Sequence, residues 1–392
     1  MRSTSLFLHG AIFIHAFEKL SKRPYAENFL LPVPVADGAA GVYSAVVDNG
    51  AGSVQVYKPN STSYEWWYFD AVSDDLKSSV VFQPDWNYAN ETAPLTVRMS
   101  FSFEDNSTSS LTFPGPEVYF STVGHGVSAI AKDGSFSWVA EPDMSAYSIE
   151  LKYPEHNITG RIHYQSVAPA HGPCSAAVSG APLDISWDLF WVNPLPDAQV
   201  TVDMVVNGSA FAFQGIGYHD KNFAGYDFSP ALNQWYWGHG RSGDLSVVWF
   251  DHLNVAGQES TSAYIAKDNK IIHAACSGVS VRPFGKGVGY PTISPHELDI
   301  EGYYIHIDAG PGGKYAFTAK ATSVLGLDLG YGRWAGTLDG GLVGGRNSWV
   351  LQCGIKWDLL ARTYKRRIGT TLVLQTETSK YYGNLYLGQH FS

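Results

Sequence analysis

From about residue 40 onward, short runs of alternating hydrophobic and polar residues recur between Gly, Pro, Asn and Asp turn signals. Alternation with a period of two, rich in β-branched and aromatic residues, is typical of β-strands. Strands are expected over 52–58, 65–73, 78–83, 95–105, 148–154, 158–167, 184–192, 200–206, 245–254, 260–275, 302–310, 314–324, 370–377 and 381–388. Only short helices are expected, near 295–300 and at 354–365. The pattern predicts an all-β fold.

The strand pattern breaks at "AGYDFSPAL", residues 224–232. A chain of 392 residues is long enough for two domains. We therefore expect a possible leader at 1–23, an N-terminal domain at 24–228 and a C-terminal domain at 229–392. Each domain is expected to be a β-barrel or a strongly curved β-sandwich, and the two are expected to pack side by side.

Composition supports this fold class and excludes some partners. Charged residues make up 16% of the chain and aromatic residues 14%, with 40 glycines. Low charge with many aromatic residues favours sheets over helix bundles. The net charge of −10 argues against nucleic acid, because phosphate binding needs a basic surface. No obligate protein partner is indicated.

The N-terminal 23 residues contain an apolar stretch that is too short to span a bilayer and resembles a weak signal peptide. N-x-S/T glycosylation sequons occur at Asn60, Asn90, Asn106, Asn157 and Asn207. Together these features favour the secretory pathway or an extracellular location over the cytoplasm.

The usual cofactor and metal motifs are missing from the sequence. Three cysteines, Cys174, Cys276 and Cys353, allow at most one disulfide and leave the pairing open. The chain has no Cys-x-x-Cys, no H-E-x-x-H, no G-x-S-x-G and no P-loop. We therefore expect no metal site and no cofactor.

A carboxylate lies among five aromatic residues in "STSYEWWYFDAVSDD", residues 61–75. In a strand, Tyr64, Trp66, Tyr68 and Asp70 share one face, and Glu65, Trp67 and Phe69 share the other. Neither is an ordinary solvent face. Glu65 must be paired or hydrogen-bonded there, or its carboxyl is held neutral.

Two further stretches concentrate polar side chains. In "FQGIGYHDKNFAG", 213–225, one side of a strand carries Tyr218, Asp220 and Asn222, and the other carries His219 and Lys221. A plain polar loop is an equally good interpretation of this stretch.

In "NQWYWGHGRSGDLSVVWFD", 233–251, one face carries two indoles followed by two polar groups: Trp235, Trp237, His239 and Arg241. Such a face suits the wall of an apolar cavity with few polar anchors. The alternative is a packed barrel face in which Arg241 pairs with an acid.

The order "YEWWYFDA", "GIGYHDKNFAG", "WYWGHGR" resembles the lipocalin-like hydroxyneurosporene synthase superfamily, which includes carotenoid 1,2-hydratases and fungal Diels–Alderases. The resemblance covers most of the chain from about residue 40. It implies two β-barrel-like domains with an apolar substrate cavity between or inside them. Asn222-Phe223-Ala224 departs from the usual Asn-Trp-Gly, so the pocket is expected to be reshaped.

The resemblance implies a cofactor-independent pericyclase of fungal secondary metabolism. The sequons and the leader favour an enzyme that joins a tropolone-type o-quinone methide to humulene in a hetero-Diels–Alder reaction. The alternatives are a decalin-forming Diels–Alderase acting on a polyketide–tetramic acid and a hydratase of a terpenoid or polyene. A lipocalin-like carrier of an apolar ligand is the non-enzymatic alternative.

A pericyclase needs two π-systems held in one orientation and donors placed on an oxygen atom. Glu65 is hypothesised to orient the substrate or to fix a donor; its alternative role is to lock the barrel. The candidate catalytic residues are Glu65, Tyr218, His219, Asp220, Arg241 and Lys356. The candidate substrate-binding residues are Trp66, Trp67, Tyr68, Asn222, Trp235, Trp237, His239, Trp249 and Trp349.

Overall fold

The fold is that of a computed structural model of the chain. It describes residues 27–31, 42–43, 45–47, 51–90, 92–186, 189–225, 233–292, 299–328, 331–344 and 355–361. These residues form strands, joined by turns, bends and two short 3-10 turns, η1 (Pro154–His156) and η2 (Gly310–Gly312). The all-β prediction is confirmed.

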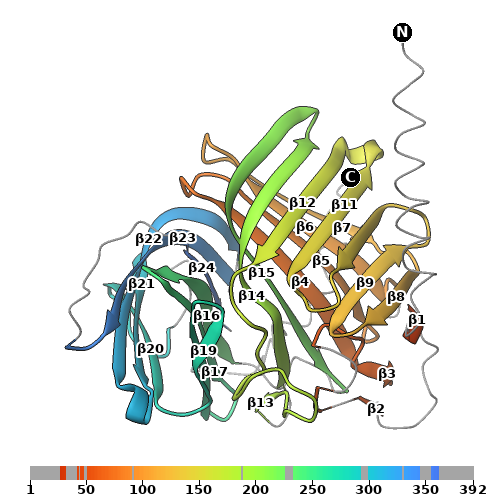
Figure 1. Cartoon of the computed structure of the whole chain (residues 1–392). Helices are drawn as coiled ribbons and strands as arrows, with labels where there is room; N and C mark the ends of the chain where they lie inside the picture. Colours follow the sequence, from red (N-terminus) through yellow and green to blue (C-terminus); the bar gives the residue numbers. More distant parts are fainter. Residues whose placement is uncertain are drawn as a thin grey trace, which may run out of the picture.

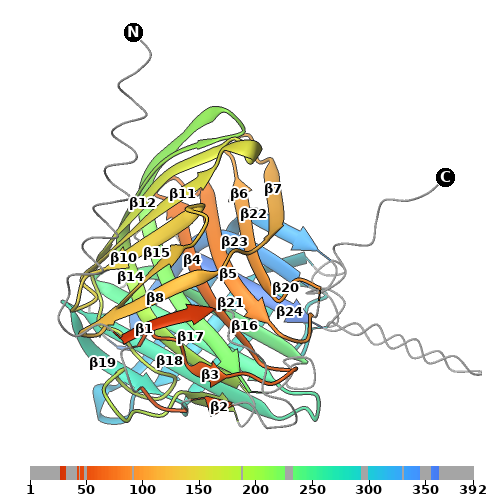
Figure 2. The same ribbon diagram turned by 90° about the vertical axis from the view of Figure 1, so that its right-hand side faces the viewer.

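The first half of the chain forms a 13-stranded antiparallel sheet in the order β1-β8-β9-β10-β11-β12-β14-β15-β4-β5-β6-β7, with β13 paired to β14. Its strands are β1 (Glu27–Leu31), β4 (Tyr64–Ser73), β5 (Ser79–Asn87), β6 (Leu95–Ser102), β7 (Thr108–Pro114), β8 (Val118–Val123), β9 (Gly126–Ala131), β10 (Phe136–Ala140), β11 (Ala146–Tyr153), β12 (Ile158–Ser166), β13 (Asp184–Ser186), β14 (Leu189–Val206) and β15 (Ser209–Ala224). A separate pair is formed by β2 (Val42–Tyr43) and β3 (Val56–Lys58). In Figure 2, β1 lies beside β8 at the edge of the curved sheet.

The second half forms a nine-stranded antiparallel sheet in the order β19-β18-β17-β16-β24-β23-β22-β21-β20. Its strands are β16 (Gln234–Ser242), β17 (Leu245–Leu253), β18 (Glu259–Lys267), β19 (Lys270–Ala275), β20 (Val279–Lys286), β21 (Asp299–Asp308), β22 (Lys314–Asp328), β23 (Tyr331–Leu342) and β24 (Ile355–Ala361). Figure 1 shows two strongly curved sheets side by side, with β14 and β15 of the first next to β16 and β17 of the second.

Burial explains which faces meet. The last eight residues of β14 alternate between exposed and buried, as expected for a strand with one solvent face. In contrast, β4 is buried along nearly its whole length on both faces. The side chains on one face of β4 pack against other residues of the first sheet, and those on the other face point to the second sheet. The prediction that neither face of this strand meets solvent is confirmed.

The main core continues across the contact between the sheets. It contains inward residues of the first sheet such as Trp67, Phe69 and Trp138, and also Trp237 and Phe250 of the second sheet. A separate cluster fills the inside of the second sheet. The two sheets are therefore joined through an apolar layer of the same kind as a domain interior.

Two local predictions are wrong. Residues 355–361 form β24, which is paired on both sides by β16 and β23, and not a helix. The run 184–192 was expected to be one strand, but it contains β13 and the start of β14, which pair antiparallel with Asp184 opposite Phe190. The helix expected near 295–300 lies mostly outside the described residues, and its last two positions begin β21. The expected strands at 370–377 and 381–388 also lie outside.

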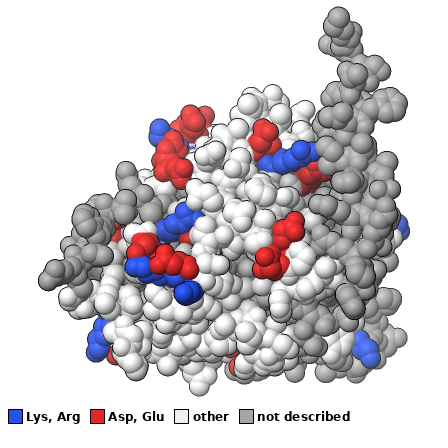
Figure 3. All heavy atoms as spheres, in the orientation of Figure 1, with Lys and Arg blue, Asp and Glu red and all other residues white. Residues whose placement is uncertain are grey.

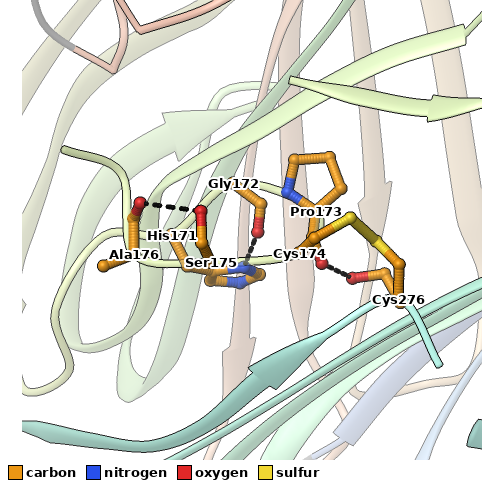
Figure 4. Close-up of a disulfide and its surroundings, with 8 residues drawn as sticks. His171, Gly172, Pro173, Cys174, Ser175, Ala176 and Cys276 are labelled. Atoms are coloured by element: carbon orange, nitrogen blue, oxygen red, sulfur yellow. Dashed lines mark hydrogen bonds between the residues drawn. A yellow bond between two sulfur atoms is a disulfide. The ribbon is translucent and has the colours of Figure 1, made fainter. Parts of the chain in front are cut away.

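A disulfide joins the two halves of the chain. Cys174 bonds to Cys276, 102 residues away, and leaves the third cysteine outside the described residues. Figure 4 shows the strap that carries Cys174, in which His171 Nδ1 bonds to the Gly172 carbonyl. The His171 ring stacks on Tyr264 of β18 with centroids 4.1 Å apart. The strap is thus fixed to the second sheet both covalently and by packing.

The surface agrees with the low charge of the sequence. The face in Figure 3 carries small groups of acidic and basic side chains and no continuous basic patch. Among the described residues, no helix is long and apolar enough to cross a membrane.

Candidate functional site

A cavity lies where the outer face of the first sheet meets the second sheet. It is partly open to solvent and has a volume of about 50 Å³. Aromatic side chains form most of its wall, and three polar side chains interrupt them. The lining residues are Trp66, Tyr68, Gln83, Asp220, Asn222, Trp235, Trp237, Phe250 and Tyr331.

Asp220 is the acid of this cavity. One of its oxygens, Oδ2, accepts hydrogen bonds from the Tyr218 hydroxyl and from Trp191 Nε1, each 2.8 Å long. Tyr218 in turn accepts a hydrogen bond from Trp237 Nε1 at 3.2 Å. Among the described residues, no group donates a hydrogen bond to Oδ1 of Asp220. The described residues therefore hold the Asp220 carboxyl group through Oδ2.

Burial raises the pKa of Asp220 to about 7, because its charged form is poorly solvated. The hydrogen bonds from Trp191 and Tyr218 lower this pKa, and the nearby Asp70 raises it. A carboxyl group with a pKa near neutrality keeps a proton in a substantial fraction of molecules at physiological pH. It is then both a hydrogen-bond donor and a general acid.

A second polar pair lies behind Tyr218. His239 Nε2 lies 3.2 Å from the Asp70 carboxylate. The His239 ring also stacks on the Tyr218 ring, with centroids 4.2 Å apart. This pair fixes the position of Tyr218 and brings a second acid close to Asp220.

The predicted strand faces are confirmed on β4, β15 and β16. Of the predicted substrate-binding residues, five line the cavity: Trp66, Tyr68, Asn222, Trp235 and Trp237. Of the predicted catalytic residues, Asp220 lines the cavity and Tyr218 bonds to it. His239 does not line the cavity, but its ring stacks on the Tyr218 ring.

Glu65 lies on the opposite face of β4, away from this cavity. It is fully buried, forms an ion pair with Lys221, and accepts the backbone N–H groups of Gln55 and Val56 at 2.8 and 3.1 Å. Lys221 also donates to the Ser53 carbonyl, and burial lowers its pKa. These contacts match the alternative in which Glu65 locks the barrel.

His219 and Trp67 also point into the first sheet. The His219 ring stacks on Phe69 with centroids 3.8 Å apart, and burial lowers its pKa. The Trp67 ring packs against the Phe120 ring, with centroids 4.6 Å apart. Phe223, of the altered Asn-Phe-Ala motif, stacks on Phe190 on this same inner side. None of these residues lines the cavity between the sheets.

Arg241 and Trp249 are likewise placed away from the cavity lining. Arg241 binds the buried Asp197 through Nε and Nη2, with the shortest contacts at 2.7 Å, as in the alternative interpretation of that strand. Trp249 lies in the core of the second sheet. The backbone of Lys356 pairs with His239 and Ala335, but its side chain is not described, and Trp349 lies outside the described residues.

The sequons differ in accessibility. Asn106, Asn157 and Asn207 are exposed at turns with positive φ. The Asn60 and Asn90 side chains are half-buried, and their Oδ1 atoms accept hydrogen bonds from Thr62 and Thr92, respectively. Glycosylation stays a prediction.

Sequence reasoning missed four residues of the site: Trp191, Gln83, Phe250 and Tyr331. They come from β14, β5, β17 and β23, so only the tertiary fold brings them to Asp220. The one local signal was Trp191, which lies in a strongly aromatic strand. Among the described residues, no three His, Cys, Asp or Glu side chains gather as a metal site would require.

Comparison with known proteins defines the class. A model of the Diels-Alderase-like family matches residues 43–282, more than half of the chain. The chain therefore belongs to the Diels-Alderase-like family, and the resemblance to fungal Diels–Alderases is confirmed. The crystal structure of CghA superposes with a TM-score of 0.71 at 17% identity and covers 88% of this chain and 100% of CghA, which supports the fold.

Two relatives carry a different activity in their names. The chain is 32% identical over 267 residues to the quinolone epoxide rearrangement protein asqO of Emericella nidulans, covering 64% of this chain and 71% of asqO. It is 29% identical over 304 residues to the quinolone epoxide rearrangement protein penF of Penicillium thymicola, covering 73% of this chain and 82% of penF. Family and relatives place the chain among pericyclase-type enzymes of secondary metabolism.

Proposed function

We propose that this chain is a cofactor-independent enzyme that binds a small, largely apolar substrate between its two sheets and activates a substrate oxygen through Asp220. The observation that carries the proposal is the state of the Asp220 carboxyl. It lies in an aromatic wall, has a pKa raised to about 7, and accepts hydrogen bonds from the described residues through Oδ2 alone.

The two donors on Oδ2 decide where the proton of the neutral acid lies. Because Trp191 and Tyr218 both donate to Oδ2, that oxygen acts as the acceptor, and the proton belongs on Oδ1. A neutral carboxyl oriented in this way donates to an oxygen atom in the cavity.

Two reaction types use such a donor. A hydrogen bond to a carbonyl or quinone-methide oxygen lowers the LUMO of the electron-poor partner and stabilises charge that develops in a cycloaddition. Full transfer of the proton to an epoxide oxygen converts it to a hydroxyl as a ring C–O bond breaks. The rearranged product then returns a proton to the Asp220 carboxylate, so the reaction is a net isomerisation that needs no co-reactant.

The aromatic wall contributes orientation. Trp66, Trp235 and Trp237 offer rigid apolar faces on which planar or polyene substrates stack. Holding reacting groups in a productive arrangement contributes up to about 7–11 kcal/mol to lowering a barrier.

Three substrate classes follow from the family and its relatives. The tropolone quinone methide with humulene, and a polyenoyl tetramic acid, are the classes predicted from the sequence. The names of asqO and penF add an epoxide of a quinolone, and the proton-bearing carboxyl supports this third class. We therefore propose acid-assisted rearrangement of an oxygenated heterocycle as the leading activity and cycloaddition as the second.

The test combines these substrates with two variants of one residue. Purified protein, Asp220→Asn and Asp220→Leu are each mixed with a quinolone epoxide, with humulene plus an o-quinone methide generated in situ, and with a polyenoyl tetramic acid. Products are quantified by chiral chromatography against a buffer blank. Asparagine accepts from Trp191 and Tyr218 and still offers an N–H, but it transfers no proton.

The outcomes separate the mechanisms. Turnover of the epoxide that is lost in both variants supports proton transfer. Stereoselective adduct formation that survives in Asp220→Asn and is lost in Asp220→Leu supports hydrogen-bond activation. If both variants turn over every substrate at the wild-type rate, the role of Asp220 is refuted. Incorporation of ¹⁸O from labelled water indicates the hydratase alternative, and binding without any product indicates the carrier.

A further inference from the structure

One polar group of the cavity has no role in the chemistry above. Gln83 of β5 is half-buried and lines the cavity, and its carboxamide forms no hydrogen bond, ion pair or ring contact with the other residues that the structure describes. A carboxamide offers one acceptor and two donors, and a ligand that displaces water from them must supply partners or leave them unpaired at a cost. An unpaired carboxamide in an aromatic wall is therefore suited to a ligand with complementary polar atoms.

The sheet register places Gln83 at a defined separation from the acid. Asp220 of β15 pairs with Tyr68 of β4. Phe69 of β4 pairs with Phe82 of β5, so the next position, Gln83, lies beside Tyr68. Paired positions on neighbouring strands share a face, and strands are about 4.8 Å apart, so Asp220 and Gln83 are roughly 10 Å apart along the same face.

This arrangement gives the cavity two polar ends with an aromatic floor between them. Tyr68 lies between them in the sheet register and forms this floor, and the Trp237 ring meets the Tyr68 ring edge-on, with centroids 5.7 Å apart. A flat fused-ring molecule lying on this floor presents one edge to Gln83 and the opposite edge to Asp220. A molecule without polar atoms at both edges leaves one of the two groups unpaired.

We infer that Gln83 is a specificity-determining residue that recognises the amide edge of a planar lactam, with the reacting oxygen of that substrate at the Asp220 end. The inference rests on the proposed function for the role of Asp220. A cyclic lactam carries N–H and C=O side by side, and a carboxamide matches both atoms with a pair of hydrogen bonds. Glutamine reads the edge of adenine through the same kind of bidentate contact.

The inference separates the proposed substrate classes. A quinolone and a tetramic acid both contain a lactam, whereas humulene has neither a donor nor an acceptor. Gln83 therefore favours a lactam over a hydrocarbon partner. Because the lining is mostly aromatic, a fused aromatic lactam has more rings to pack against than a long flexible chain.

The experiment measures binding without turnover. Full-length protein is titrated with 2-quinolone, N-methyl-2-quinolone and coumarin, and binding is followed by tryptophan fluorescence. N-methylation removes the donor, and coumarin replaces N–H by a ring oxygen while keeping the fused rings and the carbonyl. We expect wild-type protein to bind 2-quinolone about tenfold more tightly than either analogue, the difference produced by one well-made hydrogen bond.

Variants assign this preference to Gln83. Gln83→Leu is expected to bind all three probes equally, and Gln83→Glu, which keeps the shape but loses the donors, is expected to weaken 2-quinolone binding. Gln214→Leu, at an exposed position outside the lining, is the matched control and keeps the wild-type preference.

Three results would overturn the inference: equal wild-type affinity for the three probes, no binding of any probe up to its solubility limit, or an undiminished preference in Gln83→Leu. Asp220→Asn is titrated alongside and should keep the preference for 2-quinolone. The preference for the lactam N–H and the loss of turnover in the Asp220 variants are measured separately, so either proposal can fail without the other.

Discussion

Asp220 and Lys221 are neighbours in the sequence, but their side chains lie on opposite faces of β15. Asp220 lines the cavity between the sheets, whereas Lys221 forms a fully buried ion pair with Glu65 inside the first sheet. One strand thus carries an acid with a raised pKa on one side and a buried charge pair on the other. Variants on the two sides should have separable effects on activity and on stability.

Activity that depends on protonated Asp220 should fall as pH rises through about 7. Burial raises the pKa of Asp220 to about this value, so the acid form dominates below it and is lost above it. The pH dependence of kcat/KM on the preferred substrate checks this prediction. A profile that stays flat between pH 5 and 9 would contradict it.

Tyr218→Phe should move that profile to higher pH. The Tyr218 hydroxyl donates to Asp220 Oδ2 and thereby lowers the pKa of Asp220, so removing the hydroxyl raises this pKa. We expect activity to persist further into the alkaline range, with a moderate loss in kcat because Oδ2 keeps only Trp191. A shift toward acid pH would show that Tyr218 does not act through Asp220.

Asp220 should also make the folded state less stable as pH rises. Its folded pKa of about 7 exceeds the ordinary aspartate pKa of 3.8, so the folded chain binds more protons than the unfolded chain between these values. The free energy of unfolding should fall by up to roughly 4 kcal/mol between pH 4 and pH 7 through this group. Asp220→Asn should remove that part of the slope in urea unfolding measured across this range.

Glu65→Gln should destabilise the fold while leaving chemistry intact. Removing one partner of a buried ion pair costs about 3–5 kcal/mol, because the other charge stays buried. Urea denaturation of Glu65→Gln, Lys221→Met and the double variant measures this cost, and we expect the double variant to lose less than the sum. A drop in kcat or a change of stereochemistry per folded molecule would restore the hypothesis that Glu65 orients substrate.

Loss of the disulfide should lower stability more than loss of the third cysteine. Cys174 and Cys276 are 102 residues apart, and a cross-link closing a loop of about 100 residues contributes up to about 4.7 kcal/mol in the chain-entropy model. Cys174→Ser with Cys276→Ser is compared with Cys353→Ser by urea unfolding, with and without reductant. Equal stability of the two variants would contradict the bond.

The sequence predicted the fold class and the strand faces because both depend on local alternation. The pairing of Tyr218 and Asp220 on one face, with Lys221 on the other, follows directly from the period of two. The short helix expected at 354–365 covers a run that contains good helix formers, such as Leu359, Leu360 and Ala361. In the structure two neighbouring strands override that preference.

Glu65 illustrates why the site was only partly predicted. An acid in an aromatic run signals a buried, paired group, but alternation alone does not say which face meets the substrate. The role of Glu65 is decided by Lys221 and by the backbone of residues 55 and 56, which approach from other parts of the chain. Gln83 gave no signal, because a glutamine in a strand is ordinary until its neighbours are known.

The split origin of the cavity wall has a consequence for how the site can be redesigned. The acid and its direct hydrogen-bond partners come from β14 and β15, whereas Trp235, Phe250 and Tyr331 come from β16, β17 and β23. Substituting these last three side chains would reshape the binding surface while Asp220 and its hydrogen-bond partners stay in place. The second sheet can thus be varied to change the shape of the cavity without altering its acid.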